Sequence, residues 1–494
     1  MSTPQPTPSQ RLSRAATPAK SRPYPLSLSL SRRATVEKLS DNVLLNIFCY
    51  FLDDSPGYWP RLVHICHKWR CIVLASPQAL HIRLFCTHGT PVLKTLHCWP
   101  TLSIIVQYGG LPNIDPPTPD DEENIVSALK QSDRVSSISL TVTSSLLEKL
   151  SAIEMIFPEL EDLVLLSRDI VPLTLPSTFR WGPRLRCLHL TGIIFLSLLR
   201  PLYTSRDLVD LQLHEVLDPP NFSPEVLVDA LSGMGQLRSL SLHFVFTTYH
   251  IDISPQSRKR VVLPALTCLN FRGVTQYLES LVARIDAPRL GDIEVTILNE
   301  SIFELSKLNE FIDRIVRHRS HRQAEILFSE SAISISWTHP GDSTSIKFHI
   351  SCEPLIVQLS LLNQICIQFP TFLLNVEDLC IVATGQSQGG SRPWLGSLNP
   401  FTGVKRFHVA GSDSANIVRA LQLPERQRDN VLPSLHTLLM SQPEPHLREA
   451  VVSVMVSRRL SGHPITVEYG PLCHISGAGK AGTISARTST TTAH

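Results

Sequence analysis

The sequence predicts an α/β fold, in which a small helical bundle near the N-terminus is followed by an irregular repeat solenoid with a parallel sheet on one face and helices on the other. Residues 39–73 hold apolar residues at helical spacing in less length than a self-sufficient domain needs. Further along the chain, an apolar triplet with the spacing Leu-x-x-Leu-x-Leu recurs at the length of one supersecondary unit. With 494 residues, of which 43% are hydrophobic, the chain can bury a large core.

Both ends of the chain are predicted to be disordered. Residues 1–35 form a basic tail that is rich in Ser, Thr and Pro and contains no acidic residue. Such a composition cannot bury enough apolar surface to offset the loss of chain entropy. Residues 473–494, which are rich in Gly and Thr, receive the same prediction.

Residues 36–82 are predicted to form helices. Ser40 or Asp41 can cap a first helix, whose apolar residues recur at three- and four-residue intervals. Pro60 suits the first turn of a second helix, whose apolar positions continue as far as Val73. Periodicity alone is equally compatible with an ordinary helical hairpin of a globular core.

The order of residues in this segment resembles an F-box. The likeness rests on the apolar run from Leu39 to Leu52, a short acidic loop, and the sequence Leu-Val-x-x-Cys-x-x-Trp-Arg at 62–70, although the usual Leu-Pro opening is Leu39-Ser40 here. The resemblance implies a small helical bundle that binds a Skp-type adaptor and, through it, a cullin-RING ubiquitin ligase. The residues that it implies at or beneath the adaptor interface are Leu39, Leu44, Ile47, Phe48, Leu52, Leu62, Val63, Cys66 and Trp69.

Residues 83–117 are expected to connect this segment to a repeat domain that spans residues 118–472. The apolar triplets begin at Val135, Leu160, Leu185, Leu208, Leu237, Leu266 and Leu290, and they return at Val376, Val404 and Leu435. The residues that alternate with the triplets are mostly polar. Because successive side chains of a strand face opposite ways, each triplet predicts a short strand with one apolar and one polar face.

This pattern resembles a leucine-rich-repeat solenoid. It departs from that family where regular repeats carry an Asn, since Ile193, Val245 and Val274 stand at that position. An irregular α/β domain with a mostly parallel sheet is therefore the alternative. Residues 332–337 and 345–350 alternate like the two strands of a hairpin and interrupt the repeats.

The architecture leads us to expect a protein target on the polar face of the sheet. Several histidines lie there, which is compatible with pH-sensitive binding, although solvent-exposed polar residues without such a role are the more frequent explanation. The expected target-binding residues are His189, Gln212, His214, His243, Asn270, Arg272 and Glu294.

Motifs for chemistry are sparse. The sequence contains no Gly-rich phosphate loop, nucleophile elbow or paired His-Glu metal motif, so we predict no enzyme activity, cofactor or metal. The net charge of +2 gives no reason to expect nucleic acid or a membrane as a partner. Eleven scattered cysteines, an odd number, favour free thiols in the cytoplasm or nucleus.

These observations predict a substrate-recognition adaptor of an SCF-type ubiquitin ligase, with a Skp-type adaptor, a cullin and an unknown protein substrate as partners. Two alternatives remain at this point. One is an F-box scaffold that acts outside the ligase, and the other is an enzyme hidden in an irregular α/β domain.

Overall fold

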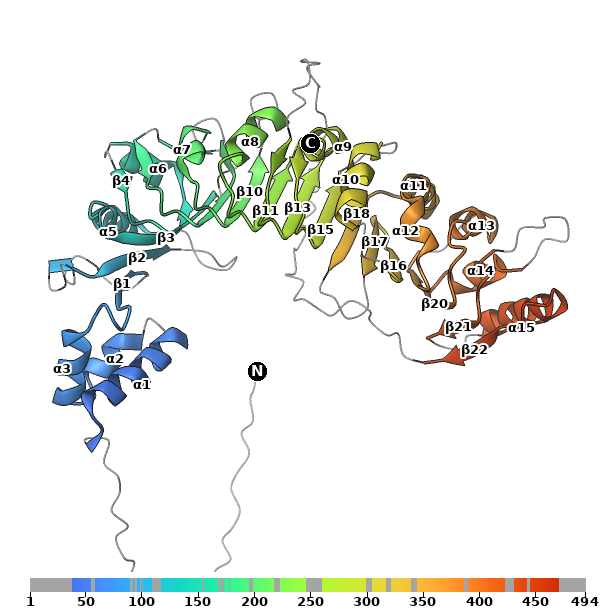
Figure 1. The fold of residues 1–494 in the computed structure, drawn as a ribbon, viewed down its shortest axis with the longest axis horizontal. Coiled ribbons are helices and arrows are strands. Elements are labelled where there is room, and N and C mark those ends of the chain that lie inside the picture. The colour runs from blue at the N-terminus through green and yellow to red at the C-terminus, as the bar shows by residue number, and fades with distance from the viewer. Residues whose placement is uncertain are drawn as a thin grey trace, which may run out of the picture. The chain divides into compact units, whose positions relative to one another are not determined.

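A computed structural model of the chain contains two compact units, Met1–Ile82 and Arg83–His494 (Figure 1). Both predicted disordered ends, residues 1–35 and 473–494, lie outside the described residues. The structure describes residues 38–470 except for 55–57, 89–91, 93–95, 98, 100, 109–116, 153–154, 168, 170–172, 177, 195–198, 217–222, 246–259, 299–303, 317–320, 339–343, 386–389, 423–430 and 442–444.

The first unit contains the helices α1 (Asp41–Asp54), α2 (Trp59–Val63) and α3 (His67–Ala75). The hydroxyl of Ser40 accepts a hydrogen bond from the amide of Val43 at 3.4 Å, so Ser40 caps α1 as predicted. The rings of Phe48 and Trp69 lie 4.6 Å apart between their centroids and join α1 to α3.

The predicted second helix of this unit is divided, and the expectation of one continuous helix was wrong. The chain turns at residues 64–65, and Cys66 is extended, with φ −156° and ψ 170°. The break frees the carbonyl of Val63, which accepts a hydrogen bond from Nε of Arg70 at 2.8 Å. A later side chain thus satisfies a backbone acceptor that a continuous helix would have used internally.

The second unit is built on one large sheet. Within the described residues, its sixteen strands follow the order β1-β2-β3-β5-β8-β10-β11-β13-β15-β18-β17-β16-β19-β20-β21-β22, and every neighbouring pair is parallel except β18-β17 and β17-β16. The prediction of an α/β fold with a large, mostly parallel sheet and helices is confirmed. The strands are β1 (Arg83–Cys86), β2 (Ser103–Tyr108), β3 (Val135–Val142), β5 (Asp162–Ser167), β8 (Cys187–Thr191), β10 (Asp210–Val216), β11 (Ser239–Phe244), β13 (Cys268–Gly273), β15 (Asp292–Ile297), β16 (Gln323–Phe328), β17 (Ala332–Thr338), β18 (Ser345–Ser351), β19 (Asp378–Ala383), β20 (Arg406–Gly411), β21 (Thr437–Met440) and β22 (Thr466–Tyr469).

The predicted triplets form the core of this unit. Every triplet residue is at most 3% exposed, and the central residues pair strand to strand, as in Leu188 with Leu211 and Leu211 with Leu240. The register keeps the apolar face continuous, since a slip of one residue would turn each strand over. The apolar spacing therefore predicted these strands and their buried face correctly.

Residues 83–117 do more than connect the two units, which corrects the predicted domain boundary at residue 118. They contribute β1 and β2, the first two strands of the sheet, and Leu84, Ile104 and Val106 are buried in its core. These strands lack a full Leu-x-x-Leu-x-Leu triplet, and for that reason the repeat spacing did not reveal them.

The interruption of the repeats is an antiparallel meander. Strands β16, β17 and β18 enter the sheet in reversed order, so that β18 pairs with β15 and β16 pairs with β19. The predicted hairpin of residues 332–337 and 345–350 is confirmed as β17 and β18, while its expected turn lies outside the described residues.

Helices cover one side of the sheet, and Figure 1 shows α8, α9, α10 and α11 along it. Thr118 begins α5 with a capping box to Asp121, and the hydroxyl of Ser223 caps α8. The carboxylate of Glu279 in α9 accepts hydrogen bonds from the amides of Lys307 and Leu308 at the start of α10, at 2.7 and 2.8 Å. The helices are α5 (Pro119–Leu129), α6 (Ser144–Ser151), α7 (Leu199–Thr204), α8 (Pro224–Leu231), α9 (Thr275–Val282), α10 (Ser306–Val316), α11 (Leu355–Gln368), α12 (Pro370–Leu374), α13 (Arg392–Leu398), α14 (Ser414–Arg419) and α15 (Pro445–Leu460).

In the described part of the chain, three short parallel strand pairs lie outside the main sheet. They are β4 (Met155–Phe157) with β7 (Phe179–Trp181), β6 (Leu173–Thr174) with β9 (Ile193–Ile194), and β12 (Val261–Val262) with β14 (Ile285–Asp286). None of the described helices is long and apolar enough to cross a membrane.

Candidate functional site

Four of the nine predicted adaptor-binding residues form the interior of the first unit. Leu44, Phe48, Leu52 and Leu62 are 4% exposed or less, and they pack between the helices. Leu39, Val63, Cys66 and Trp69 are half-buried, and the carbonyl of Leu39 accepts a hydrogen bond from Nζ of Lys68 at 2.7 Å. Ile47 alone among the nine is exposed, at 46%.

A second apolar stripe runs along the outside of α1. We call it the α1 face, and it consists of Val43, Ile47, Tyr50 and Phe51, which are 43%, 46%, 77% and 43% exposed. These residues stand at helical spacing beside the buried stripe. Exposed apolar stripes of this kind are typical of protein interaction sites.

Sequence reasoning missed three of these four residues, although a signal for them was present. The α1 sequence DNVLLNIFCYFLDD has apolar residues around most of its circumference, whereas one buried stripe needs only a third of it. The apolar residues outside the buried stripe were therefore available in the sequence as a signal for a second apolar face.

The side of the sheet opposite the helices carries the predicted target-binding residues, and we call it the open face. Strand pairing places Gln212 of β10 beside His189 of β8 and Ser241 of β11, while Asn270 of β13 stands beside Glu294 of β15. His243 of β11 pairs in register with Arg272 of β13. The predicted residues therefore form two adjacent rows across five neighbouring strands.

Asp210 organises one end of the open face. Its Oδ2 lies 2.8 Å from Nε2 of His189 and accepts a hydrogen bond from Nε2 of Gln212 at 3.0 Å. Burial raises the pKa of Asp210, but hydrogen bonds from His189, Ser239 and Gln212 outweigh it, and the pKa falls below its usual value. Asp210 is thus a carboxylate at neutral pH, and it fixes the orientation of two predicted binding residues.

Two histidines stack at the centre of the open face. The rings of His214 and His243 lie 3.9 Å apart with an angle of 5° between their planes, and Nε2 of each approaches the hydroxyl of Ser241, at 3.0 and 3.4 Å. Burial, with help from His243 and His189, lowers the pKa of His214 to about 4. Burial, with help from Arg272, also lowers the pKa of His243. A neutral pair of this kind offers both donors and acceptors to a ligand.

The other end of the open face is charged and exposed. Arg272 and Glu294 project from neighbouring strands, as predicted, and the face continues onto β18 with Lys347 and His349. Burial, followed by the charge of Arg272, lowers the pKa of His349. Sequence reasoning missed the two β18 residues because the meander brings β18 beside β15 although about fifty residues separate them.

The open face lacks an activated nucleophile among the described residues. Cys187 begins β8 and Cys268 begins β13, but burial is the main cause that raises the pKa of both thiols, to about 11 for Cys187. A thiol with a raised pKa stays protonated at neutral pH and reacts slowly. In the described part of the chain, no three His, Cys, Asp or Glu side chains are placed to hold a metal ion. The open face is arranged for hydrogen bonding and ion pairing.

Comparison with known proteins finds a structural similarity to a leucine-rich-repeat protein. No family model matches the chain, and no curated protein matches it. Among solved structures, the leucine-rich repeat-containing protein LegL7 from Legionella pneumophila is similar to this chain, with 11% sequence identity and a TM-score of 0.27. The similarity covers 76% of this chain and 97% of LegL7.

Proposed function

We propose that this protein is the substrate-recognition adaptor of an SCF-type cullin-RING ubiquitin ligase. The first unit would bind a Skp-type adaptor in the manner of an F-box, and the open face of the second unit would bind a protein target. The protein would work in the cytoplasm or nucleus.

The observation that carries this proposal is the α1 face within a segment that resembles an F-box. Burial of Leu44, Phe48 and Leu52 leaves the exposed Ile47 and Phe51 free to meet another protein. Burying an exposed aliphatic or aromatic side chain of this size contributes roughly 1.5–3 kcal/mol. The α1 face has the chemistry of an interface core, which is apolar and rich in aromatic residues.

The open face supports the second half of the proposal. It presents hydrogen-bonding groups and charges on a rigid sheet whose strands are fixed by buried leucines, and such a surface can recognise a folded or extended protein. The chain would supply no catalytic group. It would accelerate ubiquitin transfer by holding a lysine of the target near the charged conjugating enzyme, which raises the effective concentration of that lysine.

The deciding experiment is co-purification of the full-length chain with a Skp-type adaptor and a cullin. We expect both partners to co-purify with the wild-type chain and neither with the double variant Ile47→Asp, Phe51→Asp. The matched control is Val452→Asp, which places the same charge on an exposed apolar residue of another helix, α15, where the wild-type side chain is 60% exposed. Circular dichroism would establish that the variants are folded.

The possible results separate the proposal from its rivals. Recovery of adaptor and cullin, abolished by the double variant and kept by the control, supports a ligase component. Recovery of the adaptor without a cullin supports a scaffold outside the ligase and rejects the proposed function. Recovery of neither partner rejects both readings.

A further inference from the structure

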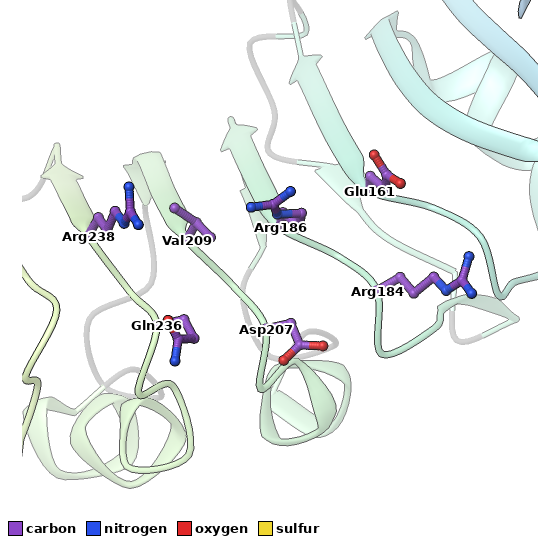
Figure 2. A pocket seen from close by; sticks show the side chains of 7 residues that line it. All are labelled: Glu161, Arg184, Arg186, Asp207, Val209, Gln236 and Arg238. Atoms are coloured by element: carbon purple, nitrogen blue, oxygen red, sulfur yellow. The ribbon is translucent and has the colours of Figure 1, made fainter. Parts of the chain in front are cut away.

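A surface cavity lies away from the open face, at the edge of the sheet where the strands begin. It has a volume of about 370 Å³. Figure 2 shows Arg186 and Arg238 on either side of Val209, with Asp207 and Gln236 on the turns before the strands and Glu161 beside Arg186. The cavity lies within the second unit and spans the starts of β5, β8, β10 and β11.

The repeat itself builds this cavity. Glu161, Arg186, Val209 and Arg238 each immediately precede a strand, and their backbones form a hydrogen-bonded chain. The amide of Arg186 donates to the carbonyl of Glu161 at 2.8 Å, that of Val209 to Arg186 at 2.7 Å, and that of Arg238 to Val209 at 2.8 Å. Side chains at this one position of successive repeats therefore project from the same edge at the spacing of the strands.

Two arginines of the cavity carry a charge that the fold leaves available. Arg184 forms an ion pair with Glu159, but Arg186 and Arg238 form no ion pair with any residue that the structure describes. Both are exposed, and Val209 between them is half-buried. An exposed guanidinium is a strong, directional binder of carboxylate and phosphate oxygens because its donors form a planar fork.

We propose that this cavity binds an acidic segment of a partner protein, with Arg186 and Arg238 each pairing with a separate carboxylate. Arg186 immediately precedes β8 and Arg238 immediately precedes β11. These two strands lie two positions apart in the sheet, which separates the backbones of the two arginines by ~10 Å. Alternate side chains of an extended segment stand about 7 Å apart on one side, and the flexible arginine side chains span the difference. The amide of Gln236 adds a neutral donor at the rim.

The acidic residues of the cavity favour carboxylates over more highly charged ligands. Glu161 and Asp207 also line it, and they repel a dianionic phosphate more strongly than a single carboxylate. They oppose a polyanion such as nucleic acid still more strongly, since a polyanion would place several charges beside them. This inference rests on the proposed function in one respect, namely that the second unit binds protein. It adds a second binding surface and the chemistry of the segment that binds there.

The test measures the binding of labelled peptides to the full-length protein by fluorescence anisotropy. The probe is an extended peptide with glutamates at alternate positions, compared with the same peptide carrying glutamines and the same peptide carrying phosphoserines. The protein variants are Arg186→Gln and Arg238→Gln. The matched control is Arg206→Gln. Arg206 is an exposed arginine at the same edge of the sheet, but it does not line the cavity.

We expect the glutamate peptide to bind more tightly than the other two. Each of the two cavity variants should weaken its binding about tenfold, because each removes a charge-assisted hydrogen bond. The control variant should bind the glutamate peptide as tightly as the wild type does. Glu161→Gln should bind this peptide more tightly because it removes a repelling charge, and added salt should weaken the binding of the peptide to the wild type. Equal binding of the glutamine peptide, or equal binding of the glutamate peptide by the wild type and by both cavity variants, overturns the proposal. Tighter binding of the phosphoserine peptide overturns the assignment to carboxylates. The assay needs no adaptor, so its outcome is independent of the co-purification experiment.

Discussion

The stacked histidines of the open face make the stability of this protein depend on pH. The pKa of His214 is about 4 in the folded chain, because burial and its histidine neighbours disfavour the charged ring, whereas an unfolded histidine titrates near 6.5. Between these two pH values the unfolded chain holds more protons than the folded chain. The free energy of unfolding therefore falls as the pH drops from about 6.5 towards 4.

The size of this effect follows from the two pKa values. Without solvent screening, the difference between the two pKa values lowers the free energy of unfolding by about 2 kcal/mol between pH 7 and pH 5. Because the ring of His214 is only half-buried, solvent screens part of the effect, and we expect roughly 1 kcal/mol from this residue. The lowered pKa values of His243 and His349 act in the same direction.

Urea unfolding followed by circular dichroism at pH 7 and pH 5 tests this reasoning. We expect His214→Gln to reduce the loss of stability between these pH values by about 1 kcal/mol relative to wild type. His446→Gln, which changes an exposed histidine of α15, should leave the loss as it is in wild type. If wild type and His214→Gln lose the same stability between pH 7 and pH 5, the argument from burial and stacking is refuted.

Three further substitutions test the packing of the second unit by urea unfolding at pH 7. Leu240→Ala removes a fully buried side chain and should cost about 2–5 kcal/mol, whereas Val262→Ala, at a residue 56% exposed, should cost little; equal losses would contradict the assigned core. Gly411→Ala should destabilise strongly, because φ is +93° and a Cβ would lie 2.1 Å from the carbonyl oxygen of Ala383, while Gly233→Ala, with no atom within 4 Å of the added Cβ, should be tolerated. Glu279→Ala should cost about 1–2 kcal/mol because it leaves two amides at the start of α10 without their acceptor, and an unchanged stability would exclude this capping role.

The repeat could be predicted from the sequence because its signal is both local and redundant. Leu211 is flanked by polar residues and stands in the same triplet position as Leu188 and Leu240, and each of the three is buried and pairs in register with the next. Alternation identified the strands, and the common spacing identified them as one repeat. The predicted open-face residues followed from the same alternation and lie together on β8 to β15.

The rest of the fold could not be predicted because it depends on contacts between distant parts of the chain. The break at Cys66 is stabilised by a hydrogen bond from Arg70 to the carbonyl of Val63, and periodicity carries no information on such a bond. The cavity at the edge of the sheet was missed for a related reason. Arg186 and Arg238 precede their strands, where alternation has not yet begun, so their shared direction appears only once the repeats are stacked.

The α1 face illustrates a different limit of sequence reasoning. The resemblance to a known motif implied nine residues at or beneath an interface, and four of these residues, Leu44, Phe48, Leu52 and Leu62, are buried between the helices. Their conversion to alanine would unfold the first unit and would say nothing about binding. Ile47 and Phe51 are the informative positions, because they can be changed without opening the core.

The reversed meander divides the second unit into two folding segments. In a regular solenoid each repeat docks on the one before it, so order can spread along the chain from any starting point. Here β15 pairs with β18, which follows β16 and β17 in the chain, so β15 cannot complete its pairing until β18 has formed. The amide of Ser345 donates a hydrogen bond to Oδ1 of Asp292, 53 residues earlier in the chain, at 3.1 Å. Closing so long a loop is slow, because chain entropy is lost before the contacts that compensate for it can form. Strands β1 to β15 and strands β16 to β22 should therefore fold as separate cooperative blocks, joined last along the seam between β15 and β18.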